Sequence, residues 1–166
     1  MADKIKGKVW KYGDGVNTDV LYPGKYTYKN LTPEEIASHA LEDLDPDFSK
    51  KAQKGDIIVA GKNFGMGSSR EQAVTALKYK GVAAIIAKSF SRIYFRNAIN
   101  QGIPAIQSEQ ASDAIENGEI IEIDFKNGKI ITEKREFSFP SFPEKMVEIL
   151  EAGGLVEYTK KKLGKN

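Results

Sequence analysis

The chain has 166 residues, of which 40% are hydrophobic and 29% charged, so it can bury the core of one domain, and we expect residues 1–166 to form one domain. Its formal charge of +2 gives no support for nucleic-acid binding, and the absence of cysteine excludes disulfides, cysteine-held metal and thiol catalysis on this chain. Neither a membrane-length apolar run nor a signal-peptide core is present, so we expect a cytoplasmic protein that binds no membrane.

The first third of the chain predicts one strand, one irregular stretch and one helix. "KIKGKVWKYG" alternates lysine with apolar residues and predicts a strand. Residues 16–30 have no clear period and contain Pro23 and Gly24, which indicates a loop or a broken strand. In "LTPEEIASHALEDL", Thr32 and Glu35 form the pattern of a capping box around a helix start. Its His39 is better suited to a surface or interface than to a ligand, and residues 45–55 are predicted to be a linker.

The middle of the chain alternates strands with helices. "DIIVA" at 56–60 predicts a buried strand, and after a polar loop a helix runs to Lys80. "GVAAIIAKSF" and "IPAIQS" are two further strands, separated by a short helix in "SRIYFRNAINQG" that ends at Gly102. Such alternation favours parallel strands joined by helical crossovers.

The last third changes character. Residues 117–140 contain two alternating runs joined at Asn127-Gly128, a strong hairpin signal. "PEKMVEILEAGG" predicts a closing helix that stops at Gly153-Gly154, and "KKKLGK" at 160–165 is predicted to be a frayed, solvated end. The chain as a whole predicts an α/β fold with a mixed sheet and flanking helices.

The loop in "GKNFGMGSSREQA", residues 61–73, permits two interpretations. Ser68 and Glu71 have the spacing of a capping box, which would make the loop only a helix start. Alternatively, the free N–H groups of the helix N-terminus bind an anion, Arg70 grips a carboxylate with its planar fork, and Ser68 moves a proton. A nucleotide-binding loop fits less well, because "GMGSSR" lacks the third glycine of a dinucleotide motif.

Two further polar stretches are candidates for the same site. Arg92 and Arg96 are four residues apart and share a helix face, with Asn97 beside them; they are either a solvated face or a site at a subunit interface. The stretch "NTDVLYPGKYTYK" places an aspartate before a loop rich in tyrosine and lysine, which either contacts a ligand or packs on the body. Its candidate residues are Asp19, Lys25, Tyr26, Tyr28 and Lys29.

Together these stretches resemble the small subunit of the 3-isopropylmalate dehydratases, the swivel-domain chain of the aconitase superfamily, and its compact archaeal type. The resemblance runs from "GDGVNTDVLYPGKY" through "ASHALEDLDPDF" and "GDIIVAGKNFGMGSSREQAVTALKYKGVAAIIAKSFSRIYFRNAINQGIPAI" to the closing hairpin and helix. It implies a swivelling β/β/α fold and a hydro-lyase that isomerises 2-isopropylmalate and 3-isopropylmalate in leucine biosynthesis.

The resemblance also implies roles for residues and partners. Ser68 corresponds to the catalytic base, Ser69 and Arg70 to binders of the substrate carboxylate, and Asp19 to an aspartate that organises the site. Tyr26 to Lys29 fall in the loop that selects the substrate. A [4Fe-4S] cluster is implied on a separate large subunit, in a heterodimer or heterotetramer, with no metal or cofactor held by this chain.

The sequence departs from the family pattern at three positions. Tyr28 stands where related enzymes often have arginine, whereas Met66 and Gln72 replace a frequent cysteine and histidine and are expected to tune packing. In an extended loop Tyr26 and Tyr28 would share one face and Lys25 and Lys29 the other. We therefore expect tyrosine, not lysine, to face the variable substituent of the substrate, which favours a branched or short alkyl malate.

Other functions stay open at this point. Within the same class they are the small subunits of homoaconitase, of a citramalate or methylmalate dehydratase and of 2,3-dimethylmalate dehydratase. From another class comes a module that binds a small dicarboxylate without catalysis. The serine beside Ser69 and Arg70 favours an enzyme, since an anion-binding module does not need that hydroxyl.

Overall fold

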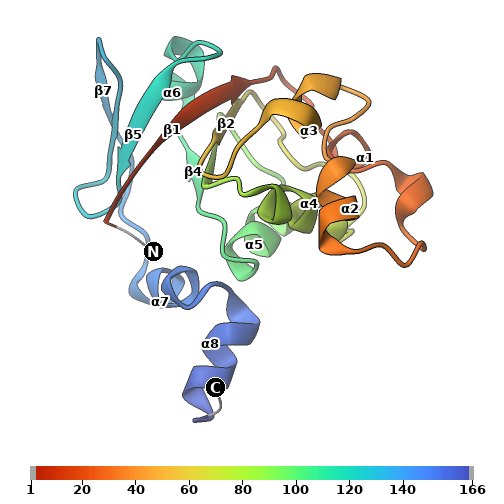
Figure 1. Ribbon diagram of the computed structural model, residues 1–166. Coiled ribbons are helices and arrows are strands. Elements are labelled where there is room, and N and C mark those ends of the chain that lie inside the picture. Colours follow the sequence, from red (N-terminus) through yellow and green to blue (C-terminus); the bar gives the residue numbers. More distant parts are fainter. Residues whose placement is uncertain (1–2, 165–166) are drawn as a thin grey trace.

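The computed structural model describes residues 3–164 and is built on a mixed sheet that curls into a half-barrel with helices around it (Figure 1). The sheet has seven strands in the order β4-β3-β2-β1-β5-β6-β7. Strand β1 is the junction, because it pairs in parallel with β2 and antiparallel with β5. The strands are β1 (Lys4–Lys11), β2 (Ile57–Ala60), β3 (Ala84–Ala87), β4 (Ala105–Gln107), β5 (Ile120–Asp124), β6 (Lys129–Ile131) and β7 (Glu136–Ser138).

The parallel half of the sheet is buried on both faces. All four residues of β2 and of β3 are buried, and neighbouring residues point into different cores. Ile58 and Ile85 join the core beneath α4 (Gln72–Lys80) and α5 (Arg92–Asn100), whereas Ile57 and Ile86 join the core inside the curled antiparallel strands. A strand that is covered on both faces of the sheet needs apolar residues at successive positions. The apolar runs in "DIIVA" and "AAIIA" meet this need, and both form strands.

Most of the remaining helices pack on other helices: α2 (Pro33–Ser38) contacts α4, α7 (Glu144–Ala152) contacts α5, and α8 (Leu155–Lys162) contacts α7. Thr32 caps α2 with the predicted capping box, and Pro33 stands at its first turn. Helix α7 ends where Gly153 adopts a left-handed conformation, as predicted. These elements are α1 (Thr18–Leu21), the 3-10 helix η1 (Gly24–Tyr26), α2 (Pro33–Ser38), α3 (Pro46–Lys51), α6 (Glu109–Ala114), α7 (Glu144–Ala152) and α8 (Leu155–Lys162).

Several predictions about local structure are wrong. The stretch predicted as a loop or broken strand contains α1 and η1, because Asn17 caps α1 and Leu21 of that helix is buried in the core. The predicted linker contains α3, which Asp45 caps and Phe48 anchors in the core. The sequence reading also missed α6 and β7, and the predicted frayed end is helical through Lys162, since α8 packs on α7 (Figure 1). Residue 165 of that stretch lies outside the described residues.

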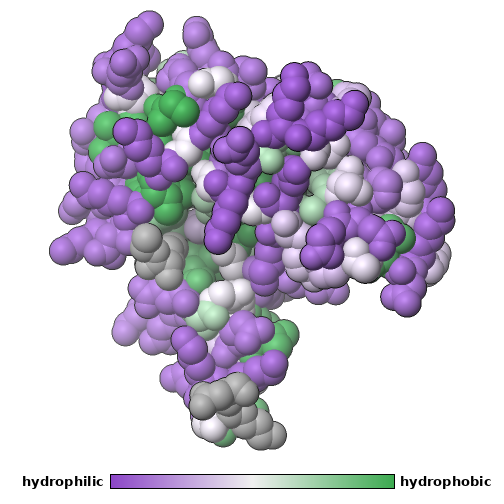
Figure 2. Space-filling model, in the orientation of Figure 1, coloured by the Kyte–Doolittle hydropathy of each residue, from purple (hydrophilic) through white to green (hydrophobic). Residues whose placement is uncertain are grey.

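The surface drawn in Figure 2 is mostly hydrophilic, with hydrophobic residues visible around the antiparallel strands. Ile120 on β5 is an exposed hydrophobic residue, with 52% of its surface exposed. In the described part of the chain, no helix combines the length and apolar character needed to cross a bilayer.

Candidate active site

The polar loop at residues 61–71, here the serine loop, joins the end of β2 to the start of α4. Two of its glycines let it lie close to other elements. Gly65 has a φ of +82° and packs on Tyr94, whose ring carbon would lie 2.1 Å from an added Cβ. Gly67 has a φ of +112°, and an added Cβ would lie 2.7 Å from the hydroxyl oxygen of Thr18. The loop is therefore held against α5 on one side and α1 on the other.

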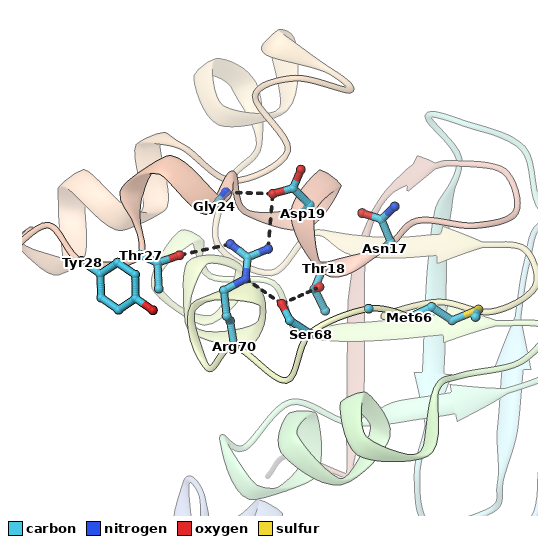
Figure 3. Close-up of a pocket in the computed structure, with 10 residues that line it drawn as sticks. Asn17, Thr18, Asp19, Gly24, Thr27, Tyr28, Met66, Ser68 and Arg70 are labelled. Carbon is cyan, nitrogen blue, oxygen red and sulfur yellow. Dashed lines mark hydrogen bonds and ion pairs between the residues drawn. The ribbon is translucent and has the colours of Figure 1, made fainter.

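Beside this loop lies an open cavity of about 700 Å³ (Figure 3). Its residues come from α1, from the segment around η1 and from the serine loop, which are far apart in the sequence. Tyr28 and Met66 stand at opposite ends in the figure, with Arg70 and Ser68 between them. The lining residues are Asn17, Thr18, Asp19, Gly24, Thr27, Tyr28, Met66, Gly67, Ser68 and Arg70.

Arg70 connects the three segments. Its Nε donates to Ser68 Oγ at 2.9 Å, its Nη1 donates to Thr27 Oγ1 at 3.2 Å, and its Nη2 donates to Asp19 Oδ1 at 3.4 Å. Only 16% of its side chain is exposed. Because a guanidinium has five N–H donors, this arrangement leaves two of them without a partner among the described residues. The guanidinium is thus fixed in place and still able to bind an anion.

Ser68 is not the cap of the following helix. Helix α4 begins at Gln72 with Glu71 as its N-cap residue, and no side chain of residues 3–164 caps that end. The carboxylate of Glu71 instead accepts a hydrogen bond from Gln101 Nε2 at 2.8 Å. The capping-box interpretation is therefore wrong. The Ser68 hydroxyl is exposed at the cavity and lies 3.4 Å from the hydroxyl of the buried Thr18.

Asp19 organises the opposite wall of the cavity. Its Oδ1 accepts from the backbone N–H of Gly24 at 2.9 Å and also meets Arg70. At Gly24 an added Cβ would lie 3.1 Å from Asp19 Oδ1 and 3.3 Å from Arg70 Nη1, so this turn has little room for a side chain. Asp19 thereby joins α1, η1 and the serine loop through one carboxylate oxygen.

The structure brings four of the sequence-predicted residues together at the cavity, namely Asp19, Tyr28, Ser68 and Arg70. The other predicted residues lie elsewhere. Ser69 and Asn97 line a small void between the serine loop and α5. Arg92 and Arg96 do share a face, but they line a separate groove of about 540 Å³ beside α7.

The loop predicted to select the substrate is not extended. Residues Gly24–Tyr26 form a 3-10 turn and Thr27 is helical, so Tyr26 and Tyr28 do not share a face. Tyr28 is 99% exposed and lines the cavity, whereas the described structure does not include Tyr26 and Lys29 among the lining residues. Tyr26 stacks on His39, and the Nζ atoms of Lys25 and Lys29 both lie within 5.5 Å of the Tyr26 ring centroid.

Sequence reasoning missed other residues at the cavity. The hydroxyl of Thr18 lies beside that of Ser68, and the hydroxyl of Thr27 accepts a hydrogen bond from Arg70. Thr18 could have been predicted from its position next to Asp19 in "NTD". Met66, which was expected to tune packing, lines the cavity with 48% of its surface exposed. Gln72 donates to the carbonyl oxygen of Thr27 at 3.3 Å and so supports the loop.

The part of the chain that the structure describes offers no ligand set for a metal cluster. Its sequence has no cysteine, and residues 3–164 contain no group of three or more histidine, aspartate or glutamate side chains placed to hold a metal ion. A [4Fe-4S] cluster therefore does not fit the residues of this cavity.

Comparisons with known proteins agree with this geometry. Residues 14–111 match the model of the aconitase C-terminal domain, which includes both walls of the cavity. The fold and the serine loop thus define the chain as an aconitase-type C-terminal domain.

More specific relatives are similar over nearly the whole chain. The "3-isopropylmalate dehydratase small subunit" of Hydrogenobaculum sp. is 52% identical over 162 residues, covering 96% of this chain and 98% of that relative. The protein of the same name from Caldicellulosiruptor bescii is 52% identical over 164 residues, covering 98% of each chain. The crystal structure of 3-isopropylmalate dehydratase (leuD) from Methanocaldococcus jannaschii superposes with a TM-score of 0.90 at 47% identity, covering 96% of this chain and 95% of that one. The chain belongs to the 3-isopropylmalate dehydratase small-subunit family.

Proposed function

We propose that this chain is the small subunit of a 3-isopropylmalate dehydratase, a hydro-lyase that interconverts 2-isopropylmalate and 3-isopropylmalate by dehydration and rehydration. Its role would be in leucine biosynthesis in the cytoplasm, with residues 1–166 acting as one swivel domain. Full-length identity of about 50% to proteins of that name supports this reaction. The relatives do not favour the homoaconitase, methylmalate and dimethylmalate alternatives.

The observation that carries the mechanism is the 2.9 Å hydrogen bond from Arg70 Nε to Ser68 Oγ. A serine hydroxyl is a weak base, but a cationic donor of this kind stabilises its alkoxide. Ser68 Oγ would take the proton from the substrate carbon that loses hydrogen in dehydration. The hydroxyl on the neighbouring carbon would leave with a second proton as water. In rehydration Ser68 Oγ would return its proton to that neighbouring carbon, while the hydroxyl of water would add to the carbon that lost its hydrogen.

The rest of the cavity would hold the substrate in place for this transfer. The two unpartnered N–H groups of Arg70 suit a carboxylate. Ser69, which lines the small void behind the serine loop together with Arg70, would take part in carboxylate binding only if the loop shifts on substrate binding. Asp19 fixes the guanidinium from the other side. Tyr28 and Met66 are the large, exposed side chains at the two ends of the cavity, and Tyr28, in the segment predicted to select the substrate, would face the isopropyl group.

The proposed partner is a large subunit that holds the [4Fe-4S] cluster, because the sequence has no cysteine and no group of ligand side chains for a metal occurs within residues 3–164. The cavity is open to solvent, so a second protein surface would have to close it against water. We assign Arg92 and Arg96, which line the groove beside α7, to contact with that subunit, in a heterodimer or heterotetramer.

Reconstitution tests the proposal. The isolated chain should not convert 3-isopropylmalate, and anaerobic mixing with the cluster-bearing large subunit should produce 2-isopropylmalate. Chromatography of the reaction mixture measures this product. Turnover by the isolated chain would refute the two-subunit assignment. Tight binding of a dicarboxylate without turnover in the mixture would favour the anion-binding module instead.

A further inference from the structure

A cluster of polar side chains lies behind the segment that carries Thr27 and Tyr28 to the cavity. Tyr26 Oη donates to Glu42 Oε1 at 2.7 Å, and the other carboxylate oxygen of Glu42 is 2.7 Å from His39 Nδ1. The rings of Tyr26 and His39 stack with centroids 3.8 Å apart and planes 15° apart. Lys25 Nζ lies 3.9 Å from Glu42 Oε1. Glu42 thus gathers two residues of the loop and one from the end of α2.

The segment that carries Glu42 is anchored in the core of the protein. Glu42 lies in the connection between α2 and α3, where the N–H of Leu41 donates to the carbonyl oxygen of Leu21 at 3.0 Å. Leu41 is fully buried, and α2 packs against α4, the helix that follows the serine loop. The carboxylate is therefore attached to the body of the protein and not to the loop that it holds.

From Tyr26 the contacts lead directly into the cavity. The next residue, Thr27, accepts hydrogen bonds from Arg70 Nη1 through its hydroxyl and from Gln72 Nε2 through its carbonyl oxygen. Arg70 in turn donates to Ser68. A shift of Tyr26 would move Thr27 and would remove one of the three contacts that orient the guanidinium.

The ionisation of the cluster is consistent with this arrangement. The hydrogen bond to Glu42 raises the pKa of Tyr26, so the phenol stays a donor. Burial opposes the ionised form of Glu42, but the hydrogen bonds from Tyr26 and His39 together lower its pKa. A charged acceptor paired with a neutral phenol is a strong hydrogen bond.

We propose that Glu42 is a positioning residue that holds the Tyr26–Tyr28 segment against the cavity and thereby orients Arg70 and Tyr28 toward the substrate. The inference rests on the proposed function for its kinetic consequence. A residue that only stabilises the fold would change the free energy of unfolding, whereas the loss of Glu42 would also weaken substrate binding.

The test uses Tyr26→Phe, which removes only the hydroxyl, and Glu42→Ala, each in the full chain with a saturating large subunit. Tyr12→Phe is the matched control, since Tyr12 Oη donates to Asp45 Oδ2 at 2.9 Å in an equally part-buried pair that does not line the described cavity. We expect KM for 3-isopropylmalate to rise about threefold to tenfold in both test variants with kcat within about twofold, because the loop contributes to binding in ground and transition states alike.

A second readout needs no turnover. In the isolated full chain, hydrogen exchange at the amides of Thr27 and Lys29 should become faster in Glu42→Ala and stay unchanged in Tyr12→Phe. An unchanged KM, an equal rise in the control, or unchanged exchange would each overturn the role of Glu42. A wild-type pair that does not interconvert isopropylmalates would refute the proposed function, and the exchange measurement alone would then decide whether Glu42 holds the segment.

Discussion

Replacing Ser68 by alanine separates catalysis from stability. The hydroxyl accepts one hydrogen bond from Arg70 at 2.9 Å, lies 3.4 Å from Thr18, and is exposed to water, which can replace it as a partner. Since Ser68 caps no helix in the described structure, we expect the loss in unfolding free energy to stay below about 1 kcal/mol. That corresponds to a fall in Tm of at most about 2–4 °C for a chain of this size.

The effect on turnover should be much larger. Removal of a general base lowers kcat by about 10²- to 10⁴-fold. The assay is kcat with a saturating large subunit, measured beside Tm, and Ser89→Ala is the control because Ser89 Oγ accepts from the N–H of Asn63 in the same region without lining the described cavity. If Ser68→Ala keeps its kcat while Tm falls by several degrees, Ser68 is structural and the proposed chemistry is wrong.

Three further predictions concern Arg70, Gly67 and Glu42. Arg70→Lys keeps the charge but loses the fork, so KM should rise about tenfold or more in steady-state kinetics, and unchanged kinetics would remove Arg70 from the site. Gly67→Ala should lower the free energy of unfolding in urea titrations by about 1–3 kcal/mol, because its φ of +112° and the nearby Thr18 hydroxyl exclude a Cβ, whereas Gly13→Ala, with nothing within 4 Å of an added Cβ, should not. Folding lowers the pKa of Glu42, so the contribution of its carboxylate to stability is present above the unfolded pKa and is lost as the pH falls through the folded pKa. Between about pH 5 and pH 3, Tm should therefore fall less steeply with pH in Glu42→Gln than in the wild type. An equally steep fall in the variant would contradict the lowered pKa of Glu42.

The sequence predicted those elements whose signals are local. Alternation in β1, continuous apolar runs in β2 and β3, and the capping box at Thr32 each specify one element from neighbouring residues. The turn at Asn127-Gly128 places β5 against β6 as predicted. The short helices α1 and α6 and the three-residue strand β7 were missed, because elements of this length depend on the core that they cover and have little periodicity.

The site was predictable in its parts and not in its arrangement. Ser68 and Arg70 stand out within the serine loop, but the contact of Arg70 with Asp19 joins residues about fifty positions apart. The orientation of Tyr26 depends on Glu42, which accepts its hydrogen bond, and on His39, which stacks on its ring; no period in "YTYK" indicates either contact. The sequence predicts an extended segment here, whereas the structure has a 3-10 turn over Gly24–Tyr26.

The substrate preference of the reconstituted pair tests the central claim most directly. The measurement is kcat/KM for 3-isopropylmalate, for a methylmalate and for homoaconitate under identical anaerobic conditions. Tyr28 and Met66 line the cavity, whereas Lys29 lies 5.5 Å from the Tyr26 ring centroid, so we predict that 3-isopropylmalate is preferred. A clear preference for the tricarboxylate would contradict the account, because it would require a cation at the position that Tyr28 occupies.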